Sequence, residues 1–245
     1  MKTDIPDNES PFIRLQRELG ERISDAEAGD KLPPEPQLAQ DMGVSRATLR
    51  EAMRSFEAQG LIMRKQGAGT FVVEKNGVFE TGLEVLESLE TIAERSGLDV
   101  SMGGLDIADI EATDVMEKIF SCQTGDPFVQ VTRVIYSKGR PIAFLRDTLP
   151  EDVLTSKDLN DGFTGSVLDL LIKRDDPKLG MSHTEINAVA ADHDISRALH
   201  IQRGDVLLMF EANLFNQKGE VIDHSQSYLL PGYFRFHVNR RIGII

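Results

Sequence analysis

The sequence predicts an α+β protein with two domains, and three observations lead to that prediction. Residues 8–75 hold three helix-forming patterns followed by two β-prone runs around a glycine-rich turn. From residue 83 to residue 245, helical patterns alternate with β-prone runs at hairpin spacing. A chain of 245 residues can also form two modest domains, each with its own core. We therefore expect domains over 8–75 and 83–245, with a glycine-containing linker over 76–82.

The first two helices are short and amphipathic. Ser10 and Pro11 have the residue types preferred at the N-cap and the first helical position. A stripe of apolar residues follows at helical spacing, formed by Phe12, Leu15, Leu19, Ile23 and Ala26. A second apolar helix around Leu38, Ala39 and Met42 then ends at Gly43.

A third helix is predicted over Ser45–Gln59. Ser45 is a natural N-cap, and Gly60 supplies the stop. One face of this helix is apolar and is formed by Leu49, Ala52, Met53 and Phe56. Only Val44 separates Gly43 from Ser45, so the second and third helices form a helix-turn-helix.

Three arginines form a second stripe on the third helix. Arg46, Arg50 and Arg54 recur every four residues beside the apolar face. In a helix-turn-helix the second helix lies in the major groove of DNA, where an arginine bound to guanine contributes about 1–3 kcal/mol of discrimination. The same stripe is equally typical of a solvated helix face, so the three arginines alone do not distinguish DNA binding from exposure to solvent.

A predicted hairpin after the third helix favours DNA binding. Leu61–Lys65 and Thr70–Val73 are β-prone, and the turn Gln66–Gly69 contains two glycines that permit close approach to another molecule. Arg64 and Lys65 lie at its base. Helix-turn-helix and hairpin together predict a winged helix-turn-helix, with double-stranded DNA as its partner.

The segments LPPEPQLAQDMGVSRATLREAMRSFEAQGLI and QGAGTFV resemble the DNA-binding signature of the GntR family of bacterial transcription regulators. The resemblance implies that Arg46 and Arg50 read bases or phosphates, that Ser45 and Thr48 contact phosphates, and that Gly67 approaches the minor groove. The full set of expected DNA-binding residues is Ser45, Arg46, Thr48, Arg50, Arg54, Arg64, Lys65, Gln66, Gly67, Gly69 and Thr70. This chain has Pro36 where the family usually places a DNA-contacting arginine, so its operator is expected to deviate from the usual half-site.

Charge and cysteine content limit the other function classes. The chain has 27 basic and 40 acidic residues, but residues 42–73 hold five basic and two acidic ones, so the positive footprint is local. The single cysteine, Cys122, cannot form an internal disulfide, and no cysteine or histidine spacing suggests a metal site. Neither a membrane span nor a secretion signal is apparent. We expect a cytoplasmic protein without a cofactor.

The second domain is expected to be an antiparallel sheet with helices packed on one side. The predicted helices are Leu83–Arg95, Ala112–Phe120, Ser166–Lys173 and Ile195–His200. The predicted strands are Phe128–Tyr136, Ile142–Leu149, Ser182–Ala190, Val206–Phe215, Val221–Leu229 and Phe234–Val238.

Residues from about 80 to the end resemble the UTRA effector-binding domain of HutC-type GntR regulators, whose fold is similar to chorismate lyase. The segments that carry the resemblance are VTRVIYSKGRPIAFLRDTLP, GSVLDLL and RGDVLLMFEANLFNQKGEVIDHSQSYLLPGYFRF. It implies a pocket for a small metabolite, often phosphorylated or carboxylated.

Arg133 is the leading candidate for binding that metabolite. It occupies a strand position between apolar residues, where a guanidinium needs a partner. The family implies an anionic ligand group, and the alternative is an internal salt bridge with an acid on a neighbouring strand, such as Glu185 or Asp223. Ser166 opens a helix and can bind the same anion or simply act as the cap.

Further polar residues on the later strands outline a candidate polar cavity, although each alone is more typical of an exposed or satisfied position. The expected effector-binding residues are Ser88, Arg133, Arg146, Ser166, His183, Glu185, Glu211, Asp223, Ser225 and Tyr228. Relatives have an arginine, a glutamate and a tyrosine where this chain has Ile135, Leu145 and Leu168. A small or partly apolar carboxylate, phosphonate or sulfonate is therefore expected rather than a sugar phosphate.

The expected function is that of a homodimeric repressor that binds a near-palindromic operator and responds to a small anionic effector. An enzyme is the alternative, because His183, Glu185 and Arg133 could in principle perform acid/base chemistry. No nucleophile-plus-base spacing, metal-ligand set or phosphate loop supports it.

Overall fold

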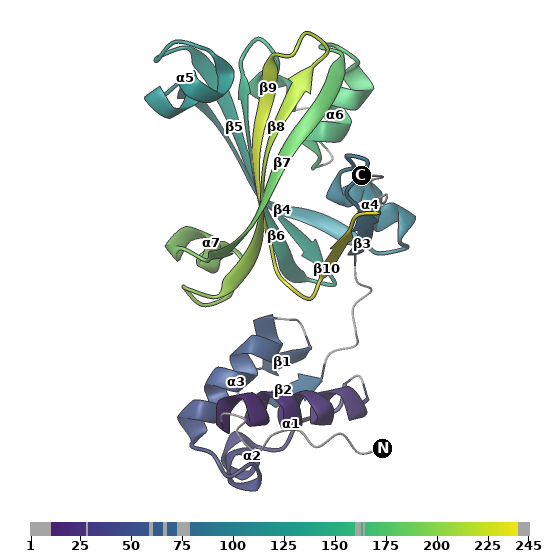
Figure 1. Ribbon diagram of the computed structural model, residues 1–245, viewed down its shortest axis with the longest axis vertical. Coiled ribbons are helices and arrows are strands. Elements are labelled where there is room, and N and C mark those ends of the chain that lie inside the picture. The colour runs from purple at the N-terminus through teal and green to yellow at the C-terminus, as the bar shows by residue number, and fades with distance from the viewer. Residues whose placement is uncertain are drawn as a thin grey trace, which may run out of the picture. The chain divides into compact units, whose positions relative to one another are not determined.

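The computed structural model describes residues 11–27, 29–58, 61–65, 68–72, 79–159, 163 and 165–239. The chain divides into two compact units, Met1–Val78 and Phe79–Ile245 (Figure 1). Within the described residues, no helix combines the length and the hydropathy that crossing a membrane requires.

The first unit is the predicted winged helix-turn-helix. Its helices are α1 (Pro11–Asp25), α2 (Glu35–Asp41) and α3 (Arg46–Ala58), and its wing is the antiparallel pair β1 (Ile62–Lys65) and β2 (Gly69–Val72). The apolar stripes of the three helices meet in one core. Ser45 caps α3 as predicted, because its Oγ accepts the Thr48 backbone N–H at 3.0 Å. Gly60, Gln66 and Gly67 lie outside the described residues.

The second unit is built on one antiparallel sheet in the order β4-β5-β6-β9-β8-β7. Its strands are β4 (Val100–Glu111), β5 (Pro127–Ser137), β6 (Arg140–Pro150), β7 (Leu179–Ala190), β8 (Val206–Asn216) and β9 (Val221–Leu229). Its helices are α4 (Leu89–Arg95), α5 (Asp114–Phe120), α6 (Val167–Arg174), α7 (His193–Ala198) and the 3-10 turn η1 (Ser156–Leu159).

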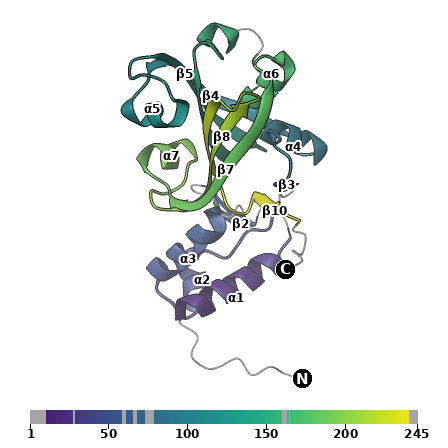
Figure 2. The same ribbon diagram turned by 45° about the horizontal axis from the view of Figure 1, so that its top comes forward.

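Helices cover both faces of this sheet, so the prediction of helices on one side was wrong. Figures 1 and 2 show α4 and α6 on one face and α5 and α7 on the other. The apolar residues of α6 pack with Val129, Val131 and Leu149, whereas Phe120 at the end of α5 stacks edge-on against Phe128, which points to the opposite side of β5. We call the side covered by α4 and α6 face A and the other side face B.

Two predictions about the start of this unit were also wrong. Phe79–Gly82, which we assigned to the linker, is strand β3 and pairs in parallel with β10 (Phe234–His237). Phe79 is buried and stacks on Phe234 with 5.0 Å between ring centroids, so this segment belongs to the core. The predicted helix from Leu83 forms only over α4, because Ser88 caps it there.

Strand β4 was not predicted. Its sequence contains Gly103 and Gly104, which weaken the alternating pattern of a strand. The pairing of β4 with β5 shifts register between Gly103 and Asp106. Gly104 has φ +57, and a Cβ on Gly103 would lie 2.8 Å from the Tyr136 ring, so this bulge requires both glycines.

Candidate functional site

The first candidate surface lies on α3 and the wing. Arg46 and Arg50 are exposed, and α3 presents them beside its buried apolar face. Arg54 instead pairs with Glu51 at 2.7 Å on the same helix. Arg46 and Arg50 remain the residues of α3 that we expect to reach a DNA groove.

Glu35, which the sequence reasoning missed, links the helix to the wing. It is the first residue of α2, and its carboxylate accepts Arg50 Nε at 2.7 Å and faces Arg64 Nη2 at 2.9 Å. Its side chain is only 21% exposed. One carboxylate thus holds two of the predicted DNA-binding arginines in a fixed orientation. An acidic residue at the start of the first helix of an arginine-rich helix-turn-helix was the available signal.

The structure gives two residues of the wing, Thr70 and Gly69, roles other than the predicted DNA contacts. Thr70 is 8% exposed, so its side chain belongs to the interior and the prediction of a DNA contact was wrong. Gly69 has φ +119, and a Cβ there would lie 2.6 Å from Lys31 Cε, so it serves the shape of the wing. The side chain of Lys65 lies outside the described residues.

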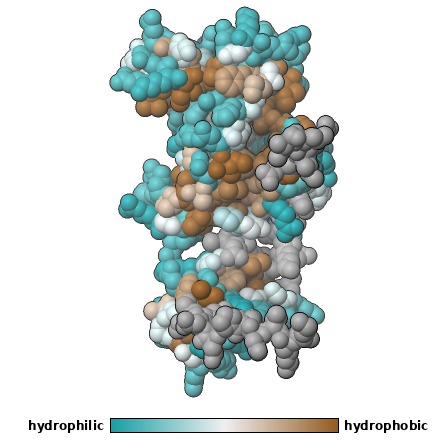
Figure 3. Space-filling model, in the orientation of Figure 1, coloured by the Kyte–Doolittle hydropathy of each residue, from teal (hydrophilic) through white to brown (hydrophobic). Residues whose placement is uncertain are grey.

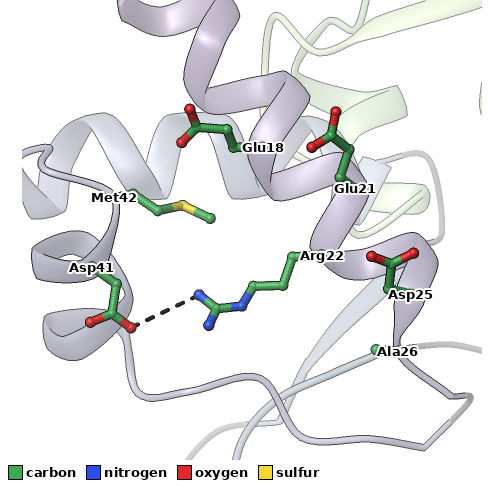
Figure 4. A pocket seen from close by; sticks show the side chains of 7 residues that line it. All are labelled: Glu18, Glu21, Arg22, Asp25, Ala26, Asp41 and Met42. Carbon is green, nitrogen blue, oxygen red and sulfur yellow. Dashed lines mark ion pairs between the residues drawn. The ribbon is translucent and has the colours of Figure 1, made fainter.

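A surface hollow between α1 and α2 is acidic. Figure 4 shows Glu18, Glu21, Asp25 and Asp41 around Arg22, whose Nη1 lies 3.9 Å from Asp41 Oδ2. A phosphate backbone would be repelled here. This side of the unit therefore does not belong to the DNA-reading surface.

The second candidate site is a buried charged cluster on face A of the second unit. Arg133 on β5 is 5% exposed and forms an ion pair with Asp147 on β6. The two side chains share a face because Asp147 lies opposite Val131, two residues along β5. The internal salt bridge to an acid on a neighbouring strand therefore exists, and that acid is Asp147 on β6 rather than Glu185 or Asp223, which we gave as examples.

Two helix starts close this cluster. Ser166 caps α6 by accepting the Asp169 N–H at 3.0 Å, which is the ordinary capping role. Ser88, the cap of α4, donates to Asp169 Oδ2 at 2.7 Å. Thr91 lies 3.5 Å from the other oxygen of Asp169. The acidic side chain of Asp169 thus joins the starts of α4 and α6.

Asp223 and Glu90 complete the cluster with unsatisfied oxygens. Asp223 on β9 is 5% exposed, and its Oδ1 has no hydrogen-bond partner among the described residues; both carboxyl oxygens of Glu90 are likewise buried and unpartnered. Burial, and then repulsion from Asp147, raise the pKa of Asp223 well above its usual range, while Arg133 opposes the shift. Burial is also the main cause that raises the pKa of Glu90. Neither carboxyl group is paired with a cation of its own within the described part of the chain.

The remaining predicted effector residues lie on face B, so they do not form one cavity with Arg133. Arg146 donates to Gln226 at 3.3 Å, Gln226 donates to Glu211 at 3.3 Å, and Tyr228 belongs to the same face. His183 and Glu185 are largely exposed to solvent. Because His183 and Glu185 point away from Arg133, the acid/base assembly that an enzyme would need is not formed. Ser225 does lie on face A, beside Asp147.

Among the described residues, no three histidine, cysteine, aspartate or glutamate side chains are arranged so that they could hold one metal ion.

The family model of the UTRA domain matches residues 95–235, and that of bacterial regulatory proteins of the GntR family matches residues 14–72. The chain belongs to the GntR family. The GntR model covers the winged unit, and the UTRA model covers the unit that holds the charged cluster.

Relatives and solved structures of this GntR-family chain agree with that assignment. It is 25% identical to the HTH-type transcriptional repressor NagR of Bacillus subtilis, over 88% of each protein. It is 26% identical to the mannosyl-D-glycerate transport/metabolism system repressor MngR of Escherichia coli, over 91% of this chain and 94% of MngR. The crystal structure of PhnF from Mycobacterium smegmatis superimposes with a TM-score of 0.63 at 19% identity, over 94% of this chain and all of PhnF. The family models and these relatives identify the chain as a transcription regulator.

Replacing Glu35 by glutamine is expected to weaken the discrimination between operator and random DNA. The change frees Arg50 and Arg64 and removes a negative charge near the phosphates, so non-specific affinity should rise about two- to tenfold and become more salt-dependent. Fluorescence anisotropy with an operator and a scrambled duplex, over a salt series, measures both affinities. Glu51→Gln, next to Arg54, is the matched control; an unchanged affinity ratio in Glu35→Gln would show that Glu35 does not position the arginines.

Replacing Asp223 by asparagine is expected to stabilise the second unit at pH values above the raised pKa of Asp223. The folded protein retains the Asp223 proton at pH values where the unfolded chain has released it, so the free energy of unfolding falls as pH rises through the raised pKa. The asparagine side chain has no charge to bury, and the variant should gain about 1–3 kcal/mol above that pKa and nothing in strong acid. Urea unfolding across pH measures this difference. The control Asp194→Asn removes an exposed carboxylate; a destabilised Asp223→Asn would mean that the Asp223 charge is satisfied.

Proposed function

We propose that this regulator is a homodimeric repressor that binds a near-palindromic operator in the cytoplasm and responds to a small anionic metabolite. The observation that carries the proposal is the combination, in one GntR-family chain, of exposed arginines on α3 with a separate UTRA domain that buries a charged cluster. The repressor relatives NagR and MngR support the sign of regulation.

The exposed edge of the sheet supports the dimer. Strand β7 has twelve residues, most of its side chains are exposed, and among the described strands it pairs with β8 alone. Ile186 is 43% exposed, and Figure 3 shows apolar surface across the middle of this unit. A long exposed edge strand promotes association unless another chain covers it. A two-fold dimer would place two α3 helices on related half-sites, which requires a near-palindromic operator.

Arg133 can bind an anionic effector only if the effector takes the place of Asp147 beside the guanidinium. Its guanidinium is held by Asp147, so an anionic group of the effector would have to displace that carboxylate. The displacement would change the contacts between β5 and β6 and so give the two states of the domain different ligand affinities, as effector control requires.

The test is thermodynamic linkage. Operator sequences are first selected from a random duplex library by the purified protein and inspected for two-fold symmetry. Metabolites are then screened by thermal shift, and the affinity of each hit is measured with and without operator. We expect the operator to weaken effector binding by the same factor by which the effector weakens operator binding. Equal effector affinity in both conditions would refute the repressor mechanism, and an asymmetric selected site would refute the dimeric reading of DNA.

A further inference from the structure

The face A cluster contains more acidic than basic side chains. Arg133 is the cationic group that acts on Glu90 and on Asp223, and it already pairs with Asp147. Asp169 is engaged by hydroxyl groups and not by a cation. Four carboxyl groups thus surround one guanidinium. An anionic ligand that carried no positive group would add to this excess and would meet repulsion from every carboxylate around Arg133.

The unsatisfied atoms of the cluster are mostly carboxyl oxygens, which act only as acceptors once the carboxyl groups are ionised. Oδ1 of Asp223 and both carboxyl oxygens of Glu90 are buried without a hydrogen-bond partner in the described structure, which is a costly arrangement for oxygens that would accept bonds from a ligand. Among the described side chains of the cluster, only Nε of Arg133 is an unpartnered donor. A ligand that donates hydrogen bonds would therefore satisfy most of the unpartnered atoms of the cluster.

From these contacts we infer that the effector carries a protonated amine, which Asp223 and Glu90 bind beside the anionic group received by Arg133. The inference rests on the proposed effector function and narrows its ligand to small amino acids and related zwitterions. Entry of such a ligand exchanges partners: its anionic group replaces Asp147 at Arg133, and its ammonium group supplies donors to the carboxylates. The ammonium group offsets the negative charge that the anionic group brings into the cluster, which an anion alone cannot do.

A metal ion does not satisfy the cluster equally well. Among the residues that the structure describes, no three carboxylates or other ligating groups converge on one point. Compact ions such as Ca²⁺ require at least that convergence. An organic cation can bridge acceptors that lie on different elements, here α4 and β9.

The experiment compares three sets of probes with the full-length protein. They are ω-amino acids of about two to six carbons, the carboxylic acids of the same lengths, and the alkylamines of the same lengths. Isothermal titration calorimetry should find at least one ω-amino acid bound about tenfold or more tightly than the acid of equal length. Asp223→Asn and Glu90→Gln should each reduce that preference to less than about threefold, whereas Asp194→Asn should leave it unchanged.

The pH dependence supplies a second readout with opposite signs for the two ligand types. An ammonium group lowers the pKa of the carboxyls that bind it, so an amino acid should release protons on binding and bind more tightly at about pH 8 than at about pH 6. An acid without an amine should take up protons and bind more tightly at the lower pH.

The possible results distinguish a failure of the amine inference from a failure of the proposed regulatory function. An acid that binds as tightly as its amino analogue and releases operator DNA would overturn the amine while leaving the anionic effector in place. An alkylamine that binds as tightly as the amino acid would support the amine and overturn the role of Arg133 as an anion receptor. Binding by no probe in any set would overturn the inference, and operator selection would still test the DNA-binding function.

Discussion

Arg46→Ala or Arg50→Ala is expected to abolish specific operator binding while the dimer persists. Each arginine is exposed on α3, and a guanidinium bound to guanine contributes about 1–3 kcal/mol per half-site. Two half-sites bring the expected loss to roughly 2–6 kcal/mol, or about 30-fold to more than 10⁴-fold in Kd. Electrophoretic mobility shift with the selected operator measures the loss, and analytical ultracentrifugation measures the dimer.

Arg14 provides the matched control for these two variants. It is also a helical arginine of the first unit, but it lies on α1 with its Nε 3.8 Å from Glu18. Arg14→Ala should bind the operator within about twofold of the parent protein. If Arg46→Ala and Arg50→Ala behaved like Arg14→Ala, the assignment of α3 as the reading helix through these residues would be wrong.

Arg133→Met is expected to cause the largest loss of stability in the second unit. The variant leaves Asp147 buried without its cation and removes the positive charge that partly offsets the burial of Asp223. Breaking a buried ion pair from one side costs about 3–5 kcal/mol. Urea unfolding of the purified variant and the parent protein under the same conditions measures this cost.

The double variant Arg133→Met/Asp147→Leu separates the structural role of Arg133 from its role in effector binding. Apolar residues of similar size often replace a buried ion pair without loss, so the double variant should recover most of the stability. Its operator binding should be normal, but it should no longer release DNA when effector is added. A double variant that still responds at the parent's effector concentration would show that Arg133 is a structural partner of Asp147 only.

Local patterns in the sequence were sufficient for the winged unit. Helix caps, apolar stripes and the glycine turn act within a few residues of one another, so Ser45, Leu49 and Gly69 could be assigned from spacing alone. The pairing of Glu35 with Arg50 and Arg64 could not, because those contacts join α2, α3 and β1. Ion pairs between elements depend on how the elements pack.

In the second unit, the sequence predicted most strands but not which polar residues meet. Alternation along β6 could have shown that Asp147 shares a side with Leu145 and Leu149, yet only the register of β5 with β6 brings it to Arg133. A strand pattern also does not show which side of a sheet a helix will cover. Our expected pocket therefore combined residues such as Glu185 and Arg133 that lie on opposite faces.

The sequence by itself determined the two-unit organisation, the reading helix and the family, because each depends on local spacing or on motifs. Only the tertiary structure decided that Arg133 is already paired and that, within the described residues, Asp223 and Glu90 have oxygens without partners. Burial and charge balance arise when β5, β6, β9 and α4 come together, since the pKa of a carboxyl depends on the groups packed around it as well as on its neighbours in the chain.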